Sequence, residues 1–410
     1  MRKRIPAFAA ITILALSACS SDDDKGSGSS STASGGSTAP STGGSTAAST
    51  GGSTSGSTAP STGASTAETG AATTEVVEAT SGSSAPTDTG ESTFDQVVAR
   101  GTLNCGVNGQ LDGFSLNTDG EYAGFDVDYC KAVAAAVLGD PEAVTYVDLT
   151  ADTRFTALQS GEIDVLIRNS TWTASRDGGL GLQWTTTTFY DGQGLLVKAD
   201  SAFETLEDLQ DTVVCVQSGT TTELNLASQF AANGITYEPL LLVDEEAVAA
   251  SFAADACDVY TTDKSGLASF RATYPDGPEA VQILDVTLSK EPLGPAVREG
   301  DDKWFDVVNW VSFAIVQAEE FGLTSENIAS AATDFADSPE IIRFIGASTG
   351  DAEFTSGLQL PPDFAVQVIT AVGNYAEIFE RNITPLGLER GLNNLWNAEE
   401  PGLLYAPPYR

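Results

Sequence analysis

The stretch ALQSGEIDVLIRN, residues 157–169, carries much of what the sequence indicates about the fold. It reads as the end of a helix, a break at Gly161, and a short apolar strand that finishes in polar residues. A helix that leads into a strand through a glycine turn is typical of a βαβ unit with parallel strands. Ligands bind at the carboxyl ends of such strands, so Asn169 lies where a binding residue is expected.

The same pattern recurs further along the chain in SFAADACDVYTTD, residues 251–263. Both stretches contain Asp-Val at the start of a predicted strand, and a polar residue follows five positions after the aspartate: Asn169 in one and Asp263 in the other. We interpret the two stretches as equivalent units of two similar lobes. Chance similarity between two ordinary αβ units is the alternative.

The segments around these units alternate between predicted strands and helices. Strands are expected at TLNCGV (102–107) and VTYVDL (144–149), and helices at 122–139 and 152–161. This rhythm predicts an α/β fold with parallel sheets flanked by helices.

A second lobe is expected to begin near FYDGQGLLVKAD, and the chain is expected to return to the first lobe near QILDVTLSKEPLGPAV. Two crossings of this kind make a hinge. The predicted domains are residues 94–191 as the first part of lobe 1, 192–287 as lobe 2, and 288–410 as the second part of lobe 1 with a C-terminal extension.

The composition excludes several kinds of function. The 410 residues include no histidine, which removes Ser-His-Asp and Cys-His nucleophiles, histidine-bound zinc and histidine as a proton shuttle. With 57 acidic and 19 basic residues, the formal net charge is −38. Nucleic acid is therefore not expected as a partner, because phosphate binding needs a basic surface. No metal or cofactor site is expected.

The N-terminus MRKRIPAFAAITILALSAC has a basic start and an apolar run that is too short to span a bilayer. Its end, LSAC, resembles the lipobox of bacterial lipoproteins, so residues 1–19 are expected to be a signal segment with Cys19 as the lipidated residue. An ordinary signal peptide is the alternative, and export is expected in both cases. Residues 20–93, rich in Ser, Thr and Gly, are predicted to be a disordered linker.

Four further cysteines follow Cys19, and an even number in an exported chain indicates disulfides. Three pairings are possible. We favour the pairing that keeps each bridge within one half of the chain, although buried thiols are an alternative. The favoured bridges are Cys105 with Cys130 and Cys215 with Cys257.

Polar residues at the predicted strand ends could meet in a cleft between the lobes. An arginine beside a helix N-terminus suits a carboxylate, and an aspartate near hydroxyl groups suits an ammonium group. Together these groups match the backbone of an α-amino acid. The candidates are Asn169, Thr171, Trp172 and Arg176 after one strand, Thr220 and Thr221 at a helix start, Asp263 after the second strand, and Leu111, Phe114 and Ser115 in the loop after the first strand.

Simpler interpretations exist for several candidates. Thr220 and Glu223 have the spacing of a capping box, which uses amides that a ligand would need. Arg176 could form a surface ion pair with Asp177, and Asp263 beside Lys264 could be solvated.

The folded part, almost all of residues 94–410, resembles the extracytoplasmic amino-acid-binding proteins of ABC transporters, and within them the general L-amino-acid-binding type. The segments that carry this resemblance include FTALQSGEIDVL, STWTASRD, CVQSGTTTELNLA, CDVYTTDKSGL and GLNNLWNAEEPGLLYAPPYR. The resemblance implies a two-lobe, periplasmic-binding-protein-like fold of type II with two hinge crossings.

By motif, the resemblance implies that Arg176 and Thr221 hold the carboxylate of an L-amino acid and that Asp263 receives the ammonium, with Thr171 and the Asn169 carbonyl. Leu111 stands where many relatives place an aromatic ring, and Trp172 could supply a ring instead.

The expected role is a binding protein rather than an enzyme, with broad specificity. It would be lipid-anchored outside the cytoplasm and would deliver its ligand to the permease. The alternatives are an enzyme similar to prephenate or arogenate dehydratases, with Glu223 or Asp263 as its acid, and a ligand sensor.

Overall fold

The structure of the protein is a computed structural model that describes residues 92–347 and 357–409, which belong to one compact unit. The predicted signal segment, Cys19 and residues 20–91 of the predicted linker lie outside the described residues. The first helix, α1 (Thr93–Arg100), begins one residue before the expected linker boundary. The Ser92 side chain caps this helix by accepting a hydrogen bond from the Asp95 backbone N–H.

One sheet is built from strands that precede and follow the segment of the second sheet in the sequence. Its strands β5, β1 and β6 are parallel, and β14 lies antiparallel between β6 and β7. In spatial order they are β5 (Val144–Asp148), β1 (Leu103–Val107), β6 (Val165–Leu166), β14 (Ala296–Arg298) and β7 (Leu182–Trp184).

The other sheet uses the middle of the chain. Its strands β10, β9 and β11 are parallel, whereas β8 runs antiparallel to β11, and β12 and β13 pair antiparallel with β8. These strands are β10 (Tyr237–Leu242), β9 (Thr212–Gln217), β11 (Val259–Asp263), β8 (Phe189–Lys198), β12 (Val281–Ile283) and β13 (Lys290–Leu293).

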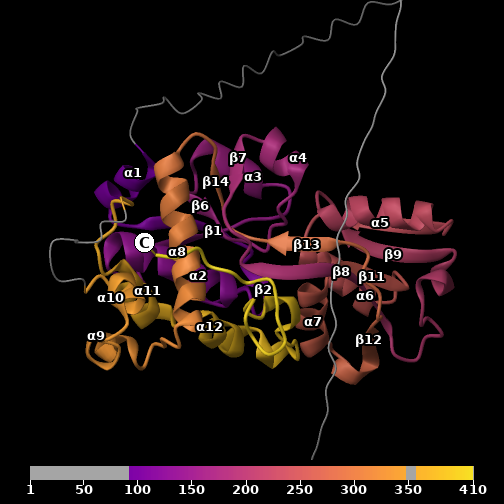
Figure 1. The fold of residues 1–410 in the computed structure, drawn as a ribbon. Coiled ribbons are helices and arrows are strands. Elements are labelled where there is room, and N and C mark those ends of the chain that lie inside the picture. Colours follow the sequence, from indigo (N-terminus) through magenta and orange to yellow (C-terminus); the bar gives the residue numbers. More distant parts are fainter. Residues whose placement is uncertain (1–91, 348–356, 410) are drawn as a thin grey trace, which may run out of the picture. The chain divides into compact units, whose positions relative to one another are not determined.

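The expectation of parallel sheets flanked by helices therefore holds in part, because each sheet also contains a reversed strand. It holds for three strands in each sheet, which are joined by helices. Of the remaining strands, β14 in the first sheet and β8 in the second run opposite to the rest of their sheets, and each is the first strand after the chain changes sheet. The chain leaves the first sheet after β7 and enters the second at β8, and it returns between β13 and β14, so it crosses twice (Figure 1).

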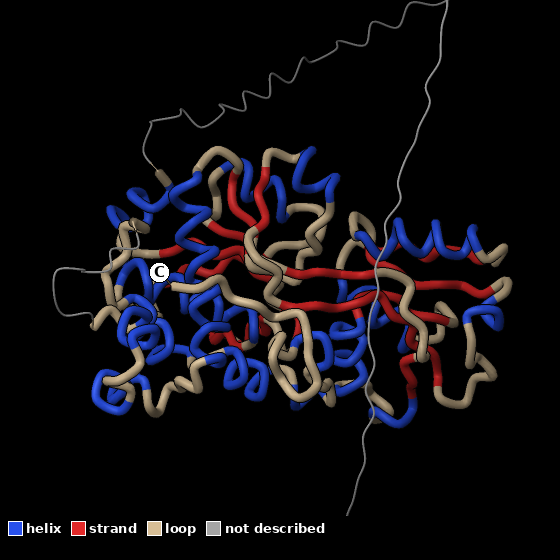
Figure 2. The backbone as a smooth tube through the Cα atoms, viewed as in Figure 1, coloured by secondary structure: helices blue, strands red, loops and turns tan. Residues whose placement is uncertain are grey.

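Helices cover both faces of the second sheet, with α5 (Thr221–Ala232) on one face and α6 (Glu245–Ala253) and α7 (Lys264–Ala272) on the other (Figures 1 and 2). The strands alternate accordingly, since successive side chains point to opposite faces. Val214 and Val216 pack in one core cluster with Phe230 of α5, whereas Cys215 packs in the other with Phe252 of α6.

The first sheet is also covered on both faces. On one face, Leu103 and Val165 share a core with helices α2 (Phe125–Leu138) and α8 (Asp302–Glu320), and on the other Leu166 packs with α3 (Arg154–Ser160). The remaining elements are the small sheet β2 (Gln110–Leu111), β3 (Ser115–Thr118) and β4 (Glu121–Ala123), and helices α4 (Ala174–Gly179), α9 (Ala331–Asp334), α10 (Pro339–Phe344), α11 (Phe364–Val372) and α12 (Tyr375–Asn382).

The C-terminal extension belongs to the core around α2 and α8. Val368 and Ile369 of α11 and Tyr375 and Phe379 of α12 are buried in the same cluster as Trp304 of α8. Among the described residues, no helix combines the length and the apolar character that crossing a membrane would take.

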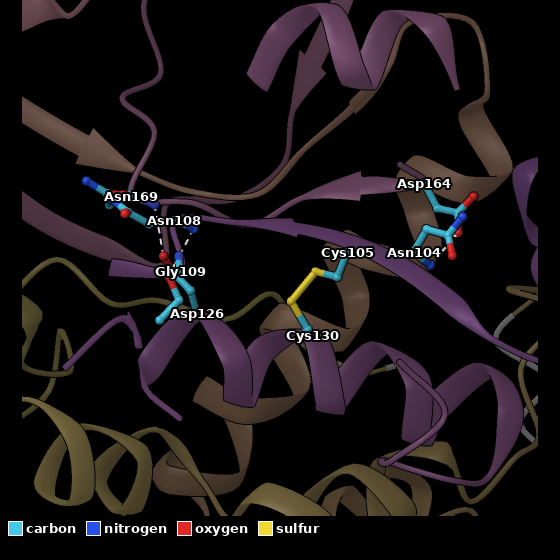
Figure 3. The surroundings of a disulfide bond; sticks show 9 residues. Asn104, Cys105, Asn108, Gly109, Asp126, Cys130, Asp164 and Asn169 are labelled. Carbon is cyan, nitrogen blue, oxygen red and sulfur yellow. Dashed lines mark hydrogen bonds between the residues drawn. A yellow bond between two sulfur atoms is a disulfide. The ribbon is translucent and has the colours of Figure 1, made fainter. Parts of the chain in front are cut away.

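Two disulfides are bonded to strands of the two sheets, and their pairing is the one favoured from the sequence. Cys105 of β1 is bonded to Cys130 of α2, so the bridge joins the first sheet to the helix that covers it (Figure 3). Cys215 of β9 is bonded to Cys257, which lies just before β11. Each bridge closes a loop in the unfolded chain and so is expected to stabilise the fold.

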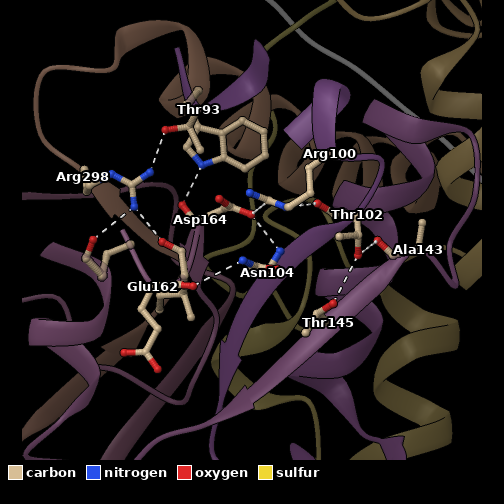
Figure 4. A network of polar contacts seen from close by, with 12 residues as sticks. Thr93, Arg100, Thr102, Asn104, Ala143, Thr145, Glu162, Asp164 and Arg298 are labelled. Atoms are coloured by element: carbon tan, nitrogen blue, oxygen red, sulfur yellow. Dashed lines mark hydrogen bonds and ion pairs between the residues drawn. The ribbon is translucent and has the colours of Figure 1, made fainter. Parts of the chain in front are cut away.

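A polar network holds the amino ends of the strands in the first sheet (Figure 4). The Asp164 carboxylate accepts hydrogen bonds from the Asn104 backbone N–H, at 2.7 Å, and from Arg100. Trp304 of α8 donates its indole N–H to the Asp164 carbonyl, and Arg298 donates to the Ile163 carbonyl at 2.7 Å. This end of the sheet is occupied by structural contacts, so the carboxyl ends are the place to look for a binding site.

Candidate ligand-binding site

The carboxyl ends of the parallel strands in both sheets meet around one small cavity of about 20 Å³. This is room for about one water. The surrounding residues lie at the carboxyl ends of β9 and β11, follow β6 or β9, or begin the helices after β5 and β10. They are Arg154, Arg168, Asn169, Thr171, Gln217, Thr220, Thr221, Thr222, Glu245, Thr262 and Asp263. Five of the predicted site residues are among them: Asn169, Thr171, Thr220, Thr221 and Asp263.

The threonine turn at the start of α5 is only partly used for capping. The Thr220 hydroxyl accepts the backbone N–H of Glu223 at 3.1 Å, as the capping box predicts. The Glu223 carboxylate, however, accepts the N–H of Gly219 at 2.9 Å instead of that of Thr220. Within the described residues, the backbone N–H groups of Thr221 and Thr222 donate to no protein acceptor. This helix start therefore still offers donors to an anion.

Gly219 brings this turn close to the loop before α3. Its φ of 72° is in the left-handed region, and a Cβ placed on it would lie 2.1 Å from Oδ1 of Asp152. A glycine is needed here because a side chain would be strained and would also meet Asp152.

Asp263 ends β11 and is 7% exposed. Asp263 is also the N-cap residue of α7, but its side chain does not cap the helix. Within the described part of the chain, its carboxylate forms neither a hydrogen bond nor an ion pair. Burial raises the pKa of Asp263 well above its usual range, and the charges of Asp191, Glu291 and Glu245 raise it further. The solvated alternative was wrong, since the side chain is buried, and the neighbouring Lys264 donates to Thr287 instead. A buried carboxylate without a partner is a suitable acceptor for a cation.

Glu291 of β13 was not predicted, yet it links several site residues. Its Oε2 accepts hydrogen bonds from the hydroxyl groups of Thr171, at 2.6 Å, and Thr221, at 2.9 Å. Its Oε1 accepts a hydrogen bond from Nδ2 of Asn225 at 2.8 Å. Thr171 follows the first sheet, whereas Thr221 and Asn225 belong to α5 of the second. Glu291 on a crossing strand therefore connects both sides of the site.

Arg176 is 8% exposed and does not line the cavity itself. Its Nη1 donates to the Thr171 carbonyl at 2.9 Å, and its guanidinium lies 5.1 Å from the ring centroid of Phe155. The surface ion pair with Asp177 was wrong, because Asp177 instead accepts the backbone N–H of Trp184. Trp172 is 41% exposed and does not line the cavity.

Three predicted residues from the loop after β1 lie away from this cavity. Phe114 is fully buried in the core, edge-on to Phe189, and the Ser115 hydroxyl accepts the backbone N–H of Asn108 at 3.0 Å. Phe114 and Ser115 therefore make structural contacts beneath this loop and do not line the cavity. Leu111 lines a larger neighbouring cavity of about 640 Å³, which shares Glu245 with the small one.

Asn108 connects the first sheet to α6 of the second, and Asn169 lies beside it (Figure 3). The side chain of Asn108 donates to Oε2 of Glu245 at 3.1 Å and contacts the Asn169 side-chain oxygen at 3.3 Å. The backbone of Asn169 has a φ of 20° and donates its N–H to Oδ2 of Asp126 at 2.9 Å. This strained residue is therefore held in place from two sides.

Sequence reasoning missed six residues around the cavity. Arg168, Gln217 and Thr262 stand at or just after strand ends, so the rule that located Asn169 and Asp263 could have found them. The others lie at helix starts: Arg154, Thr222 and Glu245. Within the described residues, no cluster of cysteine and acidic side chains could hold a metal ion.

Comparisons with known proteins agree with this geometry. Residues 103–327 match the family described as bacterial extracellular solute-binding proteins, family 3. The chain belongs to this family. It is a family of binding proteins and not of enzymes, and its members act outside the cytoplasm.

Curated relatives of this family 3 protein match along nearly their whole length. The chain is 50% identical to the general L-amino acid-binding periplasmic protein AapJ of Rhizobium johnstonii, over 80% of this chain and 95% of that protein. It is 51% identical to the glutamate/glutamine/aspartate/asparagine-binding protein BztA of Rhodobacter capsulatus, over 78% of this chain and 94% of that protein.

A solved structure shows the same fold. It is a periplasmic binding protein of an ABC transporter from Brucella ovis with glutathione bound, with a TM-score of 0.75 and 46% identity. The match covers 78% of this chain and 100% of that one. The periplasmic-binding-protein-like fold with two mixed sheets is thus established for this chain.

Proposed function

We propose that this protein captures L-amino acids between its two sheets and delivers them to the permease of an ABC transporter. The observation that carries the proposal is a cavity lined both by Asp263, whose buried carboxylate has no partner in the described part of the chain, and by Thr221 and Thr222, whose backbone N–H groups donate to no acceptor there. A zwitterionic amino acid offers an ammonium group to the first and a carboxylate to the second. The names of AapJ and BztA, which describe amino-acid binding, support the same ligand class.

The carboxylate of the ligand would also attract the guanidinium of Arg176, and the Thr171 hydroxyl and Asn169 carbonyl would contribute to the ammonium site. Because the cavity of about 20 Å³ is too small for an amino acid, binding requires the two sheets to separate and close again. The two crossings between the sheets are the expected hinge. Lobe 2 is proposed to be residues 192–287, with residues 94–191 and 288–410 forming lobe 1.

Thermal unfolding of the full chain with each of the twenty L-amino acids tests this function. A ligand at about a hundred times its dissociation constant should stabilise the protein by about 2.7 kcal/mol. Shifts with many L-amino acids and none with the D-enantiomers or sugars would support broad amino-acid binding. If none of the twenty amino acids shifts the unfolding temperature, the proposed function is refuted.

We further propose that the protein is anchored to the membrane by a lipid on Cys19, with residues 20–93 as a flexible tether. The support is the LSAC sequence and the composition of the segment that follows it. Metabolic labelling with a radioactive fatty acid should mark the wild-type protein and not the Cys19→Ser variant. Equal labelling of both would contradict the anchor.

A further inference from the structure

Three arginine side chains are buried around the candidate site. Arg154 begins α3, Arg168 follows β6, and Arg176 lies in α4, and their exposed fractions are 3%, 3% and 8%. A guanidinium group keeps its charge in a protein, and burying that charge without an anion is costly. Each of these three residues therefore needs an explanation.

The contacts of the three guanidinium groups leave them without an anionic partner. Within the described residues, none of the three takes part in an ion pair, because the ion pairs there involve other lysine and arginine side chains. Arg168 donates its Nε to the Leu149 carbonyl at 2.9 Å, and Arg176 donates to the Thr171 carbonyl. The buried Nε of Arg154 has no hydrogen-bond partner among the residues that the structure describes, and its guanidinium lies 4.7 Å from the ring centroid of Phe155.

The three positive charges are close enough to affect one another. Burial lowers the pKa of the Arg154 guanidinium well below its usual range, and the charges of Arg168 and Arg176 lower it further. Asp263 and Asp152 act in the opposite direction but do not form an ion pair with Arg154. An anion placed between Arg154 and Arg168 would therefore lower the free-energy cost of burying their two charges and would weaken the repulsion between them.

Nearby carboxylates are engaged or serve another role. The Glu245 side chain lines the cavity, and its Oε2 accepts the Asn108 amide; the Asp126 carboxylate accepts the backbone N–H of Asn169. Asp263 is the acceptor for the ligand ammonium under the proposed function. None of these acids lies within ion-pairing distance of Arg154 or Arg168.

We propose that Arg154 and Arg168 form a second anion-binding subsite, which receives a carboxylate in the side chain of the ligand. This inference rests on the proposed function, because an amino acid supplies one carboxylate for the α5 N-terminus and Arg176. Arg154 and Arg168 both line the cavity that also contains Asp263. The preferred ligands are then L-amino acids with an acidic side chain, such as aspartate and glutamate. Guanidinium groups bind carboxylates by paired hydrogen bonds, which neutral side chains cannot match in strength.

Calorimetric titration of the full chain with L-glutamate, L-glutamine and L-alanine tests this subsite. Glutamine has nearly the shape of glutamate without its charge, and alanine tests the backbone contacts alone. We expect the wild-type protein to bind glutamate at least tenfold more tightly than glutamine. In Arg154→Gln and Arg168→Gln, glutamate affinity should fall at least tenfold, whereas alanine affinity should change less than threefold.

Arg381→Gln is the matched control, because Arg381 lies in α12 and pairs with Asp128 away from the cavity. It should leave the affinities for all three ligands unchanged. Removal of an unpaired buried charge should also leave the melting temperature of ligand-free Arg154→Gln equal to that of the wild type or higher. If that variant does not fold, Arg154→Met is used in its place.

The outcomes separate this inference from the proposed function. A wild-type protein that binds alanine but does not prefer glutamate over glutamine would overturn the subsite and keep the proposed function. An equal loss of all three ligands in Arg154→Gln would also overturn it, because Arg154 would then contact the α-carboxylate. If the wild-type protein binds none of the twenty amino acids, the proposed function itself fails.

Discussion

At the start of β6, the Asp164 carboxylate accepts the backbone N–H of Asn104 from the neighbouring strand, and at the start of β11 the Asp258 carboxylate does the same with Val213. The backbone N–H groups of both aspartates also donate to those neighbours, Asp164 to the Asn104 carbonyl and Asp258 to the Val213 carbonyl. The two units, residues 157–169 and 251–263, thus begin with the same contacts. At the amino end of each strand, the aspartate therefore joins its strand to the neighbouring one by hydrogen bonds.

The same two units end differently. Asn169 is held by hydrogen bonds to Asp126 and Asn108, whereas the Asp263 carboxylate has no partner within the described residues. The amino end of each unit therefore contributes to stability, whereas the unpaired carboxylate at the carboxyl end of the second unit costs stability and, under the proposed function, receives a cation. The predictions below test this division, from the largest expected effect to the smallest.

Replacement of the unpaired carboxylate should have the largest effect on binding. We expect Asp263→Asn to weaken amino-acid binding about a hundredfold or more, about 3 kcal/mol, because the ligand ammonium loses its charged partner. The ligand-free variant should unfold at the same temperature as the wild type or higher. Calorimetry and thermal unfolding measure the two effects, and near-native affinity would show that Asp263 does not hold the ligand.

Changes at the amino ends of the strands should reverse this pattern. Asp164→Ala leaves the Arg100 guanidinium and the Asn104 N–H without their acceptor, and a loss of about 2–3 kcal/mol of unfolding free energy is expected. Asp258→Ala should cost less, about 1 kcal/mol, because Asp258 is exposed. Both variants should bind amino acids like the wild type. Urea unfolding measures the stability, and a loss of affinity in either variant would contradict the division between the two ends.

The approach of the α5 turn to the first sheet can be tested at Gly219. A Cβ at this position would meet Asp152, and its positive φ is strained for alanine, so Gly219→Ala should weaken ligand binding about tenfold. Gly161→Ala is the control. It has a similar φ of 78° but nothing within 4 Å of the added Cβ, so it should lower stability alone. Equal affinities of the two variants would argue against a close approach at Gly219.

The pH dependence of stability should show how Asn169 is held. Burial raises the pKa of Asp126 from its usual value to about 7 in the folded protein. A raised folded-state pKa contributes stability below pH 4, and this contribution is lost as the pH rises through about 7. Ligand-free wild-type protein should therefore lose stability between pH 4 and 8, and Asp126→Asn should reduce this slope. Melting temperatures across this range test the prediction, and an unchanged slope would exclude Asp126 as its source.

Much of the fold could be predicted because its signals are local. The glycine that ends α3, the apolar strands and the Asp-Val starts of β6 and β11 lie within short segments. The mixed direction of the sheets could not be predicted in this way. The strand β8 runs antiparallel to β11 because the chain changes sheets before it, and a single segment does not record the direction from which it enters a sheet.

The candidate site divides in the same way. The strand-end rule located Asn169 and Asp263, and the helix start located Thr220 and Thr221. Phe114 and Ser115 were also expected near the ligand, yet the structure puts them behind the loop, since the pleat of β3 and the packing around Phe189 decide which way they face.

The sequence by itself determined the two αβ units and the placement of polar residues at strand ends, because these depend on neighbouring residues. It favoured one pairing of the cysteines, which the structure then confirmed. Only the tertiary structure decided that Arg154 and Arg168 converge with Asp263, and that Glu291 binds both Thr171 and Thr221. These residues are far apart in the sequence, and their chemistry arises from shared burial, which removes water and leaves charges to be balanced by one another or by a ligand.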